Sequence, residues 1–214
     1  MKWIAIGAHL RRDDVEPLAD AVPVGDLFLS AISVPDDQPL GERELLRRVA
    51  GVRAQLLDVA TFVAIRYGFS FAAANEALAK CAAHLVRWRR VLEEHGSRVE
   101  MTLKVAASSP SARPDRRDFA GGAEYLRALH AATHAANVDP GFRGAADRLV
   151  IPLTVKHRWI PRDEKSIELA ALVDRARLDD VRAAGEELRQ SAPHVPFLLS
   201  GPWPLEVFAD DDHE

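Results

Sequence analysis

The stretch SRVEMTLKVAA, residues 97–107, alternates between apolar and polar side chains. Its apolar set is Val99, Met101, Leu103 and Val105, and its polar set is Glu100, Thr102 and Lys104. Because successive side chains of a strand point to opposite faces, this alternation predicts a half-buried β-strand. Such a strand covers its apolar face with helices, and the residues that follow predict them.

Five further elements follow this strand. We expect a helix over 117–136, a strand over 148–159, a strand over 166–174, a helix over 177–190 and a strand over 195–203. Pro152 makes the strand at 148–159 an edge or bulged strand, and residues 160–165 form its hairpin connection. The order strand, helix, strand, strand, helix, strand is that of a ferredoxin-like split βαβ unit. We therefore predict a ferredoxin-like α+β domain over 97–209 and an acidic tail without fixed structure over 210–214.

The residues before this strand predict a second, smaller α/β unit. Strands are expected over 2–8, 26–34 and 61–68, with short helical turns over 15–21. An apolar stripe from Leu45 to Val59 predicts an amphipathic helix, and a long helix is expected over 71–95, ending at Gly96. The N-terminal domain is thus predicted as 1–96, including the long helix. The whole chain is predicted as an α+β fold made of two α/β-type units.

The composition sets limits on the class of protein. The chain has 214 residues, with 28 basic and 32 acidic side chains, which give a formal net charge of −4. A general nucleic-acid binder carries a basic surface, so no nucleic-acid partner is expected. One cysteine builds neither a disulfide framework nor a zinc cluster, and no apolar run reaches the roughly 18–20 residues of a membrane span. These features predict a soluble cytoplasmic protein with no membrane partner.

Few residues point to metal or covalent chemistry. His130 and His134 stand four residues apart on a predicted helix, but the glutamate of the metalloprotease pattern does not follow His130. We interpret them as solvated helix histidines. Cys81 lies on the apolar face of the predicted helix 71–95 and is interpreted as a core residue. The sequence therefore predicts no cofactor, no metal site and no enzymatic site.

Four segments, in this order along the chain, resemble the GvpF/GvpL family of gas vesicle proteins. AIRYGFSF at 64–71 resembles an R-[FY]-G-x-x-F segment of that family, and VEMTLKV at 99–105 resembles its V-E-x-x-[VL]-K-V strand. GGAEYL at 121–126 is similar to the start of a G-x-x-Y-L helix, and LLSGPWPLEVF at 198–208 to a closing G-P-W-P-P-Y-x-F segment. Leu205 and Glu206 stand where the family has Pro-Tyr.

The resemblance implies a role in gas vesicle assembly rather than catalysis. Members of the family are regarded as accessory proteins, with two α/β domains of ferredoxin-like character. The resemblance implies that the chain binds the small, very hydrophobic shell protein and other gas vesicle accessory proteins. It also places the chain in the cytoplasm and at the gas vesicle.

Four residues are candidates for partner binding: Arg66, Tyr67, Trp203 and Phe208. Arg66 and Tyr67 close a predicted strand, and the two aromatic rings lie in the closing segment. Arginine and aromatic side chains are preferred anchors at interfaces. Each has a plainer interpretation, in which Arg66 pairs with a carboxylate such as Glu100 and the rings anchor the closing segment in the core. Both interpretations are left open.

Other functions compete with assembly. A small-molecule enzyme or sensor on ferredoxin-like domains predicts a closed pocket with convergent polar groups. An RNA-binding sheet face predicts exposed aromatic and basic side chains. Within the assembly hypothesis, the edge-like strand at 149–159 is a candidate for β-augmentation by the client, and a homo-oligomer is also open.

Overall fold

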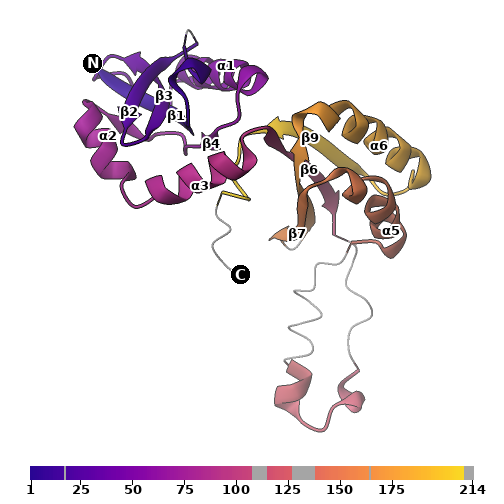
Figure 1. The fold of residues 1–214 in the computed structure, drawn as a ribbon. Helices are drawn as coiled ribbons and strands as arrows, with labels where there is room; N and C mark the ends of the chain where they lie inside the picture. The colour runs from indigo at the N-terminus through magenta and orange to yellow at the C-terminus, as the bar shows by residue number, and fades with distance from the viewer. Residues whose placement is uncertain (17, 108–114, 127–137, 164, 210–214) are drawn as a thin grey trace. The chain divides into compact units, whose positions relative to one another are not determined.

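The computed structural model describes residues 1–214 except residues 17, 108–114, 127–137, 164 and 210–214 (Figure 1). The chain combines helices with one five-stranded and one four-stranded sheet, which confirms the α+β class. It divides into two compact units, of which unit 1 is Met1–Glu100 with Pro202–Glu214 and unit 2 is Met101–Gly201. The division predicted from the sequence, 1–96 and 97–209, keeps residues 202–209 with the second domain, whereas here they group with the first.

Unit 1 is built on a sheet with the strand order β2-β3-β1-β4, in which β5 also pairs with β1. The strands are β1 Lys2–His9, β2 Asp20–Val24, β3 Leu27–Val34, β4 Val63–Ala64 and β5 Ser70–Phe71. Strand β1 pairs antiparallel with β3, β4 and β5, and its residues from Ile4 onward are buried. The predicted strands at 2–8 and 26–34 are confirmed.

Two predicted segments of unit 1 differ in the structure. The helical turns expected over 15–21 give way at Asp20 to β2, because Gly25, with a φ of 62°, turns the chain tightly into β3. The single strand expected over 61–68 is two short strands, β4 and β5. Gly68, with a φ of 97°, redirects the chain between them.

The helices of unit 1 are α1 Arg43–Val59, α2 Ala74–Cys81 and α3 Leu85–His95. Helix α1 confirms the amphipathic prediction, except that Val59, its last residue, is 63% exposed. The long helix predicted over 71–95 is wrong in its continuity, because the chain turns at residues 82–84 between α2 and α3. There the His84 N–H donates to the Cys81 carbonyl at 2.8 Å, and the turn leaves Leu78 40% exposed while Cys81 and Trp88 are buried.

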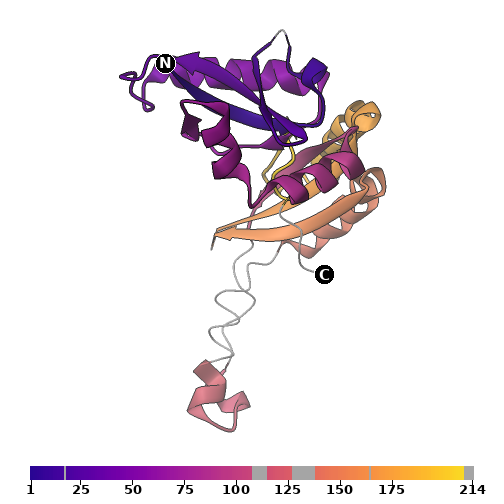
Figure 2. The same ribbon diagram turned by 60° about the vertical axis from the view of Figure 1, so that its left-hand side comes forward.

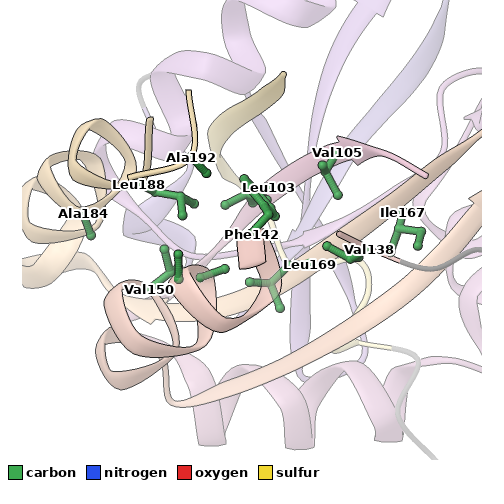
Figure 3. Packing of buried hydrophobic residues seen from close by; sticks show 12 residues of the cluster. Leu103, Val105, Val138, Phe142, Val150, Ile167, Leu169, Ala184, Leu188 and Ala192 are labelled. Carbon is green, nitrogen blue, oxygen red and sulfur yellow. The ribbon is translucent and has the colours of Figure 1, made fainter. Parts of the chain in front are cut away.

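Unit 2 holds the four-stranded sheet in the order β7-β8-β6-β9. The strands are β6 Arg98–Ala106, β7 Lys156–Asp163, β8 Ser166–Asp174 and β9 Phe197–Trp203, and the helices are α5 Pro140–Leu149 and α6 Leu178–Ser191. This strand order is the one that the ferredoxin-like prediction requires. Figure 3 shows the core, in which Leu103 of β6 and Leu169 of β8 meet Phe142 of α5 and Leu188 of α6. Both helices therefore pack on the same face of the sheet.

The prediction for residues 137–159 is wrong in its details. Helix α5 begins at Pro140, where the sequence predicts no element, because Pro140 occupies the first turn and the Asp139 side chain accepts a hydrogen bond from the Phe142 N–H at 2.8 Å. The strand expected from 148 begins only at Lys156, after a short 3₁₀ turn, Ile151–Leu153. The apolar alternation there arises because Leu149, Ile151 and Leu153 all reach the core from a helix end and this turn.

The remaining elements of unit 2 follow the prediction. Strand β8 and helix α6 have the predicted bounds to within one residue, and β9 lies inside the predicted 195–203. The predicted helix at 117–136 is described only in part: residues 122–126 are helical, and residues 127–137 lie outside the described residues. His130 and His134 therefore lie outside them too.

Candidate functional site

The closing segment of the chain is held against the sheet of unit 1. Leu205 is fully buried and forms an isolated parallel bridge with Val63 of β4. Its N–H donates to the Phe62 carbonyl at 2.9 Å, and its carbonyl accepts from the Ala64 N–H at 2.9 Å. The prolines at 202 and 204 fix their own φ angles and have no N–H, so Leu205 supplies the pairing that they cannot. The segment is thus tied by main-chain hydrogen bonds.

A buried carboxylate completes this attachment. Glu100 of β6 is 4% exposed, and its two side-chain oxygens accept hydrogen bonds from three successive backbone N–H groups. The distances are 2.8 Å to Glu206 N, 3.1 Å to Val207 N and 2.9 Å to Phe208 N. Successive N–H groups that converge on one anion form a nest of partial positive charge. We call this arrangement, Glu100 with the N–H groups of residues 206–208, the carboxylate nest.

Two opposing effects act on the pKa of Glu100 in the carboxylate nest. Burial raises the pKa of the Glu100 carboxyl, while the three N–H donors lower the pKa. Burial has the larger effect, so the net direction is upward. This combination of burial and direct N–H donation is typical of a structural clamp, because desolvation makes an unmatched buried carboxylate costly.

A half-buried arginine, Arg53, lies in the same unit. Arg53 of α1 donates from Nη2 to the Ile65 carbonyl at 2.9 Å and to the Ile6 carbonyl at 3.4 Å. Burial lowers the pKa of its guanidinium, and the charge of Glu206 acts in the opposite direction. Arg53 therefore joins α1 to β1 and to the chain just after β4, with Glu206 of the closing segment within electrostatic reach.

The structure places the predicted residues Arg66 and Tyr67 in the turn between β4 and β5. The Arg66 side chain is exposed, and Glu100, its predicted ion-pair partner, accepts from the closing segment instead. That predicted ion pair is therefore wrong. The Tyr67 hydroxyl donates to the Leu40 carbonyl, which fixes the corner that carries Arg66.

The two predicted aromatic residues have different surroundings. Trp203 is 46% exposed, whereas Phe208 is 4% exposed. Phe208 thus helps to anchor the closing segment, as the plainer interpretation expects, and Trp203 presents a large part of its ring to solvent. Trp203 and Arg66 are thus the two members of the predicted set whose side chains are exposed.

Sequence reasoning missed Glu100 as a site residue. In a strand of strict alternation its position predicts the polar face, yet its side chain is buried. Two separate features of the sequence precede this contact. A glutamate interrupts the apolar residues of the VEMTLKV segment, and a short segment that has backbone N–H groups follows GPWP about a hundred residues later. Neither segment alone indicates that the two meet.

Other polar groups of unit 1 are enclosed by packing. His9 Nε2 lies 2.9 Å from Ser30 Oγ, the Ser30 hydroxyl donates to the Gly7 carbonyl at 3.3 Å, and both side chains are fully buried. The His9 ring stacks on Phe62, and burial lowers the pKa of His9 to about 4. This histidine is therefore neutral at physiological pH and is part of the core.

One pocket of unit 1 is a candidate for binding a small molecule. A pocket of about 220 Å³ is lined in part by Leu10, Val59 and Leu92, with Arg11 and Asp14 as its charged residues. Burial raises the pKa of Asp14, and Arg11 opposes this. Within the described ranges, no group of three or more histidine, cysteine, aspartate and glutamate side chains is placed to hold a metal ion. No described helix has both the length and the apolar character that crossing a membrane requires.

Comparison with known proteins connects these features to one family. The family model described as gas vesicle synthesis protein GvpL/GvpF matches residues 16–209. The fold is similar to that of the gas vesicle protein GvpF from Anabaena sp. PCC7120, with a TM-score of 0.67, 11% identity, and coverage of 99% of each chain. It is also similar to GvpF from Microcystis aeruginosa, with a TM-score of 0.69, 10% identity, and coverage of 98% of this chain and 99% of that one. No curated protein matches the sequence. The match over residues 16–209 shows that the chain belongs to the gas vesicle synthesis protein GvpL/GvpF family.

Proposed function

We propose that this chain is a non-enzymatic accessory protein of gas vesicle assembly that binds the hydrophobic shell protein in the cytoplasm. The observation that carries the proposal is the family match, which spans residues 16–209 and thus both units. A shell protein that lines a gas space exposes a large apolar surface, and such surfaces aggregate before they are incorporated. A partner that covers this surface keeps the shell protein available for ordered assembly. Other accessory proteins of the gas vesicle are further candidate partners.

Trp203 is the proposed apolar anchor for the shell protein. Its ring is 46% exposed although the segment that follows it is fixed by Leu205 and the carboxylate nest. A large aromatic side chain on a fixed backbone loses little conformational entropy when it binds, which favours it as an interface anchor. Arg66 and Tyr67 form the second proposed contact. Phe208, which is buried, anchors the closing segment in unit 1.

Co-expression with the small shell protein from the same genome tests this function. Pull-down and sedimentation should show that the shell protein stays in solution and co-purifies with this chain. Trp203→Ala should reduce the co-purified amount several-fold, whereas Val86→Ala, at a residue 85% exposed on α3, should leave it unchanged. If the shell protein pellets equally with and without this chain, the proposal of shell-protein binding is wrong.

A further inference from the structure

The four-stranded sheet of unit 2 has two outer strands, β7 and β9, at the ends of the order β7-β8-β6-β9 (Figure 2). Strand β9 has the sequence FLLSGPW and contains no charged residue. Among the described residues, no main-chain hydrogen bond outside the helices and strand ladders involves residues 197–203. Because an outer strand is paired on one side only, the other side of β9 presents main-chain donors and acceptors that a further strand could use.

Strand β7, at the opposite edge, has features that limit such pairing. Its sequence, KHRWIPRD, holds charged side chains of both signs, and Arg162 forms an ion pair with Glu168 of β8. Pro161 has no N–H to donate. Charged side chains and proline on an edge strand act against pairing with further strands. The segment that the sequence offers for pairing with a client, 149–159, falls in part on β7, and these features favour β9 instead.

The packing of β9 assigns its side chains to the two faces of the sheet. Phe197 and Leu199 pack against the core cluster under α5 and α6, so they lie on the helix-covered face. Leu198 stands between them in the sequence, and its side chain therefore points to the opposite face, where it is 61% exposed. A strand added beside residues 197–200 would thus have apolar neighbours on both faces.

One cation lies beside this edge and is paired within α6. The guanidinium carbon of Arg189 lies 5.3 Å from the centre of the Phe197 ring. The same guanidinium forms an ion pair with Glu186 at 2.6 Å. Its charge is matched inside the helix, so it does not select an acidic partner strand.

Gly201 and Pro202 set the length of the edge. Gly201 has a φ of 125°, which differs from that of an extended strand, and Pro202 has no N–H. Regular pairing is therefore limited to residues 197–200. Trp203, the proposed apolar anchor, is the last residue of the same strand. The edge and the anchor are thus continuous in the chain.

We propose that the shell protein binds through an uncharged, extended segment that pairs with β9 at residues 197–200. This segment is apolar on both faces, because its side chains meet Phe197 and Leu199 on one face and Leu198 on the other. Strands of an antiparallel sheet commonly carry polar residues on one face. A strand that is apolar on both faces fits the hydrophobic surface that the proposed function assigns to the shell protein. Main-chain hydrogen bonds supply affinity, and the absence of charge supplies specificity. This binding mode rests on the proposed function, to which it adds the place and the geometry of contact.

A synthetic peptide tests the edge without the shell protein. The probe is a blocked six-residue peptide of alternating valine and threonine, titrated against the full chain at concentrations at which the peptide alone is monomeric. We expect saturable binding and slower hydrogen exchange within residues 197–200. A peptide of alternating valine and glutamate should bind at least about tenfold more weakly, because pairing would place its carboxylates beside apolar side chains. The valine–threonine peptide N-methylated at every residue should lose at least as much, because it has no main-chain donors.

Matched variants locate the site. Leu198→Lys places a charge on the exposed face of β9 and should weaken peptide binding about tenfold or more. Leu198→Thr keeps an uncharged side chain that favours strands and should retain the affinity within about threefold. Val86→Lys makes the same kind of charge change at a residue that is 85% exposed on α3, and it should alter the affinity by less than about twofold.

The same variants separate this binding mode from the proposed function. In the co-expression experiment, Leu198→Lys should reduce the co-purified shell protein several-fold, whereas Leu198→Thr and Val86→Lys should not. If the wild-type chain retains no shell protein, the proposed function fails, and the binding mode fails with it. If the wild-type chain retains shell protein and Leu198→Lys retains the same amount, the proposed function stands and the binding mode is wrong.

Three further results would overturn the binding mode. They are no binding of the valine–threonine peptide, equal binding of its N-methylated form, and a dimer of the free protein in which residues 197–200 are already protected. The last result would assign the edge to a second copy of the chain.

Discussion

Glu100 and Phe208 are separated by 108 positions in the sequence and joined by a 2.9 Å hydrogen bond from the Phe208 N–H to the Glu100 carboxylate. The bond is one of three that close the carboxylate nest. It fixes the closing segment beside β4 and thereby sets the backbone that follows Trp203. Glu100 thus adds a side-chain attachment of this segment to the main-chain hydrogen bonds of Leu205.

Replacing Glu100 tests the carboxylate nest. Glu100→Ala should lower the free energy of unfolding by about 3 kcal/mol, because three N–H groups lose a charged acceptor. Glu100→Gln keeps one acceptor oxygen and should cost about half as much. Hydrogen exchange should show faster exchange at residues 206–208 in both variants. Glu44→Ala, at an exposed glutamate of α1, is the control and should change neither quantity. Unchanged exchange at residues 206–208 in Glu100→Ala would contradict the clamp.

Phe208 and Trp203 should separate stability from binding. Phe208→Ala removes a ring that is 4% exposed and should destabilise the protein by about 3 kcal/mol or more. Trp203→Ala removes a ring that is 46% exposed and should cost about 1 kcal/mol or less. Urea unfolding measures both. A large loss of stability in Trp203→Ala would mean that its ring packs rather than binds.

His9 predicts a loss of stability in mild acid. Burial lowers the pKa of His9 to about 4, from 6.5 for an ordinary histidine, so the unfolded chain binds a proton that the folded chain refuses between these values. The contribution of His9 to the free energy of unfolding is complete above pH 6.5 and is lost as the pH drops toward 4, by up to about 3 kcal/mol. The raised pKa of Glu100 contributes with the opposite sign, because the folded state then holds its proton more readily.

The difference between wild type and His9→Gln isolates this contribution from that of Glu100. The variant should show a flatter decline of unfolding free energy between pH 6.5 and 4. His194→Gln, at an exposed histidine before β9, should keep the wild-type decline. Identical slopes for wild type and His9→Gln would show that His9 does not titrate with folding.

Two glycine substitutions should act in opposite directions. A Cβ at Gly7 of β1 would lie 2.2 Å from Phe62 Cδ2, so Gly7→Ala forces the ring to move and should cost about 1–3 kcal/mol. A Cβ at Gly51, inside α1, meets nothing within 4 Å, and Gly51→Ala should add up to about 1 kcal/mol through helix propensity. Thermal unfolding of the two variants checks the signs. Equal effects would show that the Phe62 ring yields without cost.

Cys81 should resist thiol reagents while the protein is folded. Its side chain is fully buried, and burial raises the pKa of the thiol to about 11, which suppresses the reactive thiolate at neutral pH. An aromatic disulfide reagent should label it only at the rate at which α2 opens or the protein unfolds. Added urea should raise that rate, and rapid labelling of the native protein would contradict its burial.

The elements that were predictable are those whose signal is local. In strands β6 and β8 and in helix α6 the apolar residues recur with the period of a strand or a helix within about a dozen residues. This recurrence was sufficient to locate these elements. Helix α5 lies almost entirely between residues 136 and 148, where no element was predicted, although Asp139 as the N-cap and Pro140 in the first turn favour a helix start there. The extent of β4 depends on Leu205, which no local pattern at residues 61–68 contains.

The same distinction holds for the candidate site. Exposure of Arg66 and Trp203 agrees with the partner-binding prediction, whose test remains the shell-protein experiment. Glu100 was assigned to the polar face because only the strand's own alternation was considered. Its burial follows from the N–H groups of residues 206–208, and the sequence holds no rule that brings these two segments together.

The grouping of residues 202–214 with residues 1–100 has a consequence for synthesis on the ribosome. The first hundred residues emerge early, but Leu205 and the donors to Glu100 emerge only after all of unit 2. Until then the Glu100 carboxylate lacks its three N–H donors, and Val63 lacks its bridge to Leu205. Unit 1 is therefore the first part of the chain to be synthesised and the last to be completed. A chain that terminates before residue 205 would have a first unit without the contacts of its closing segment.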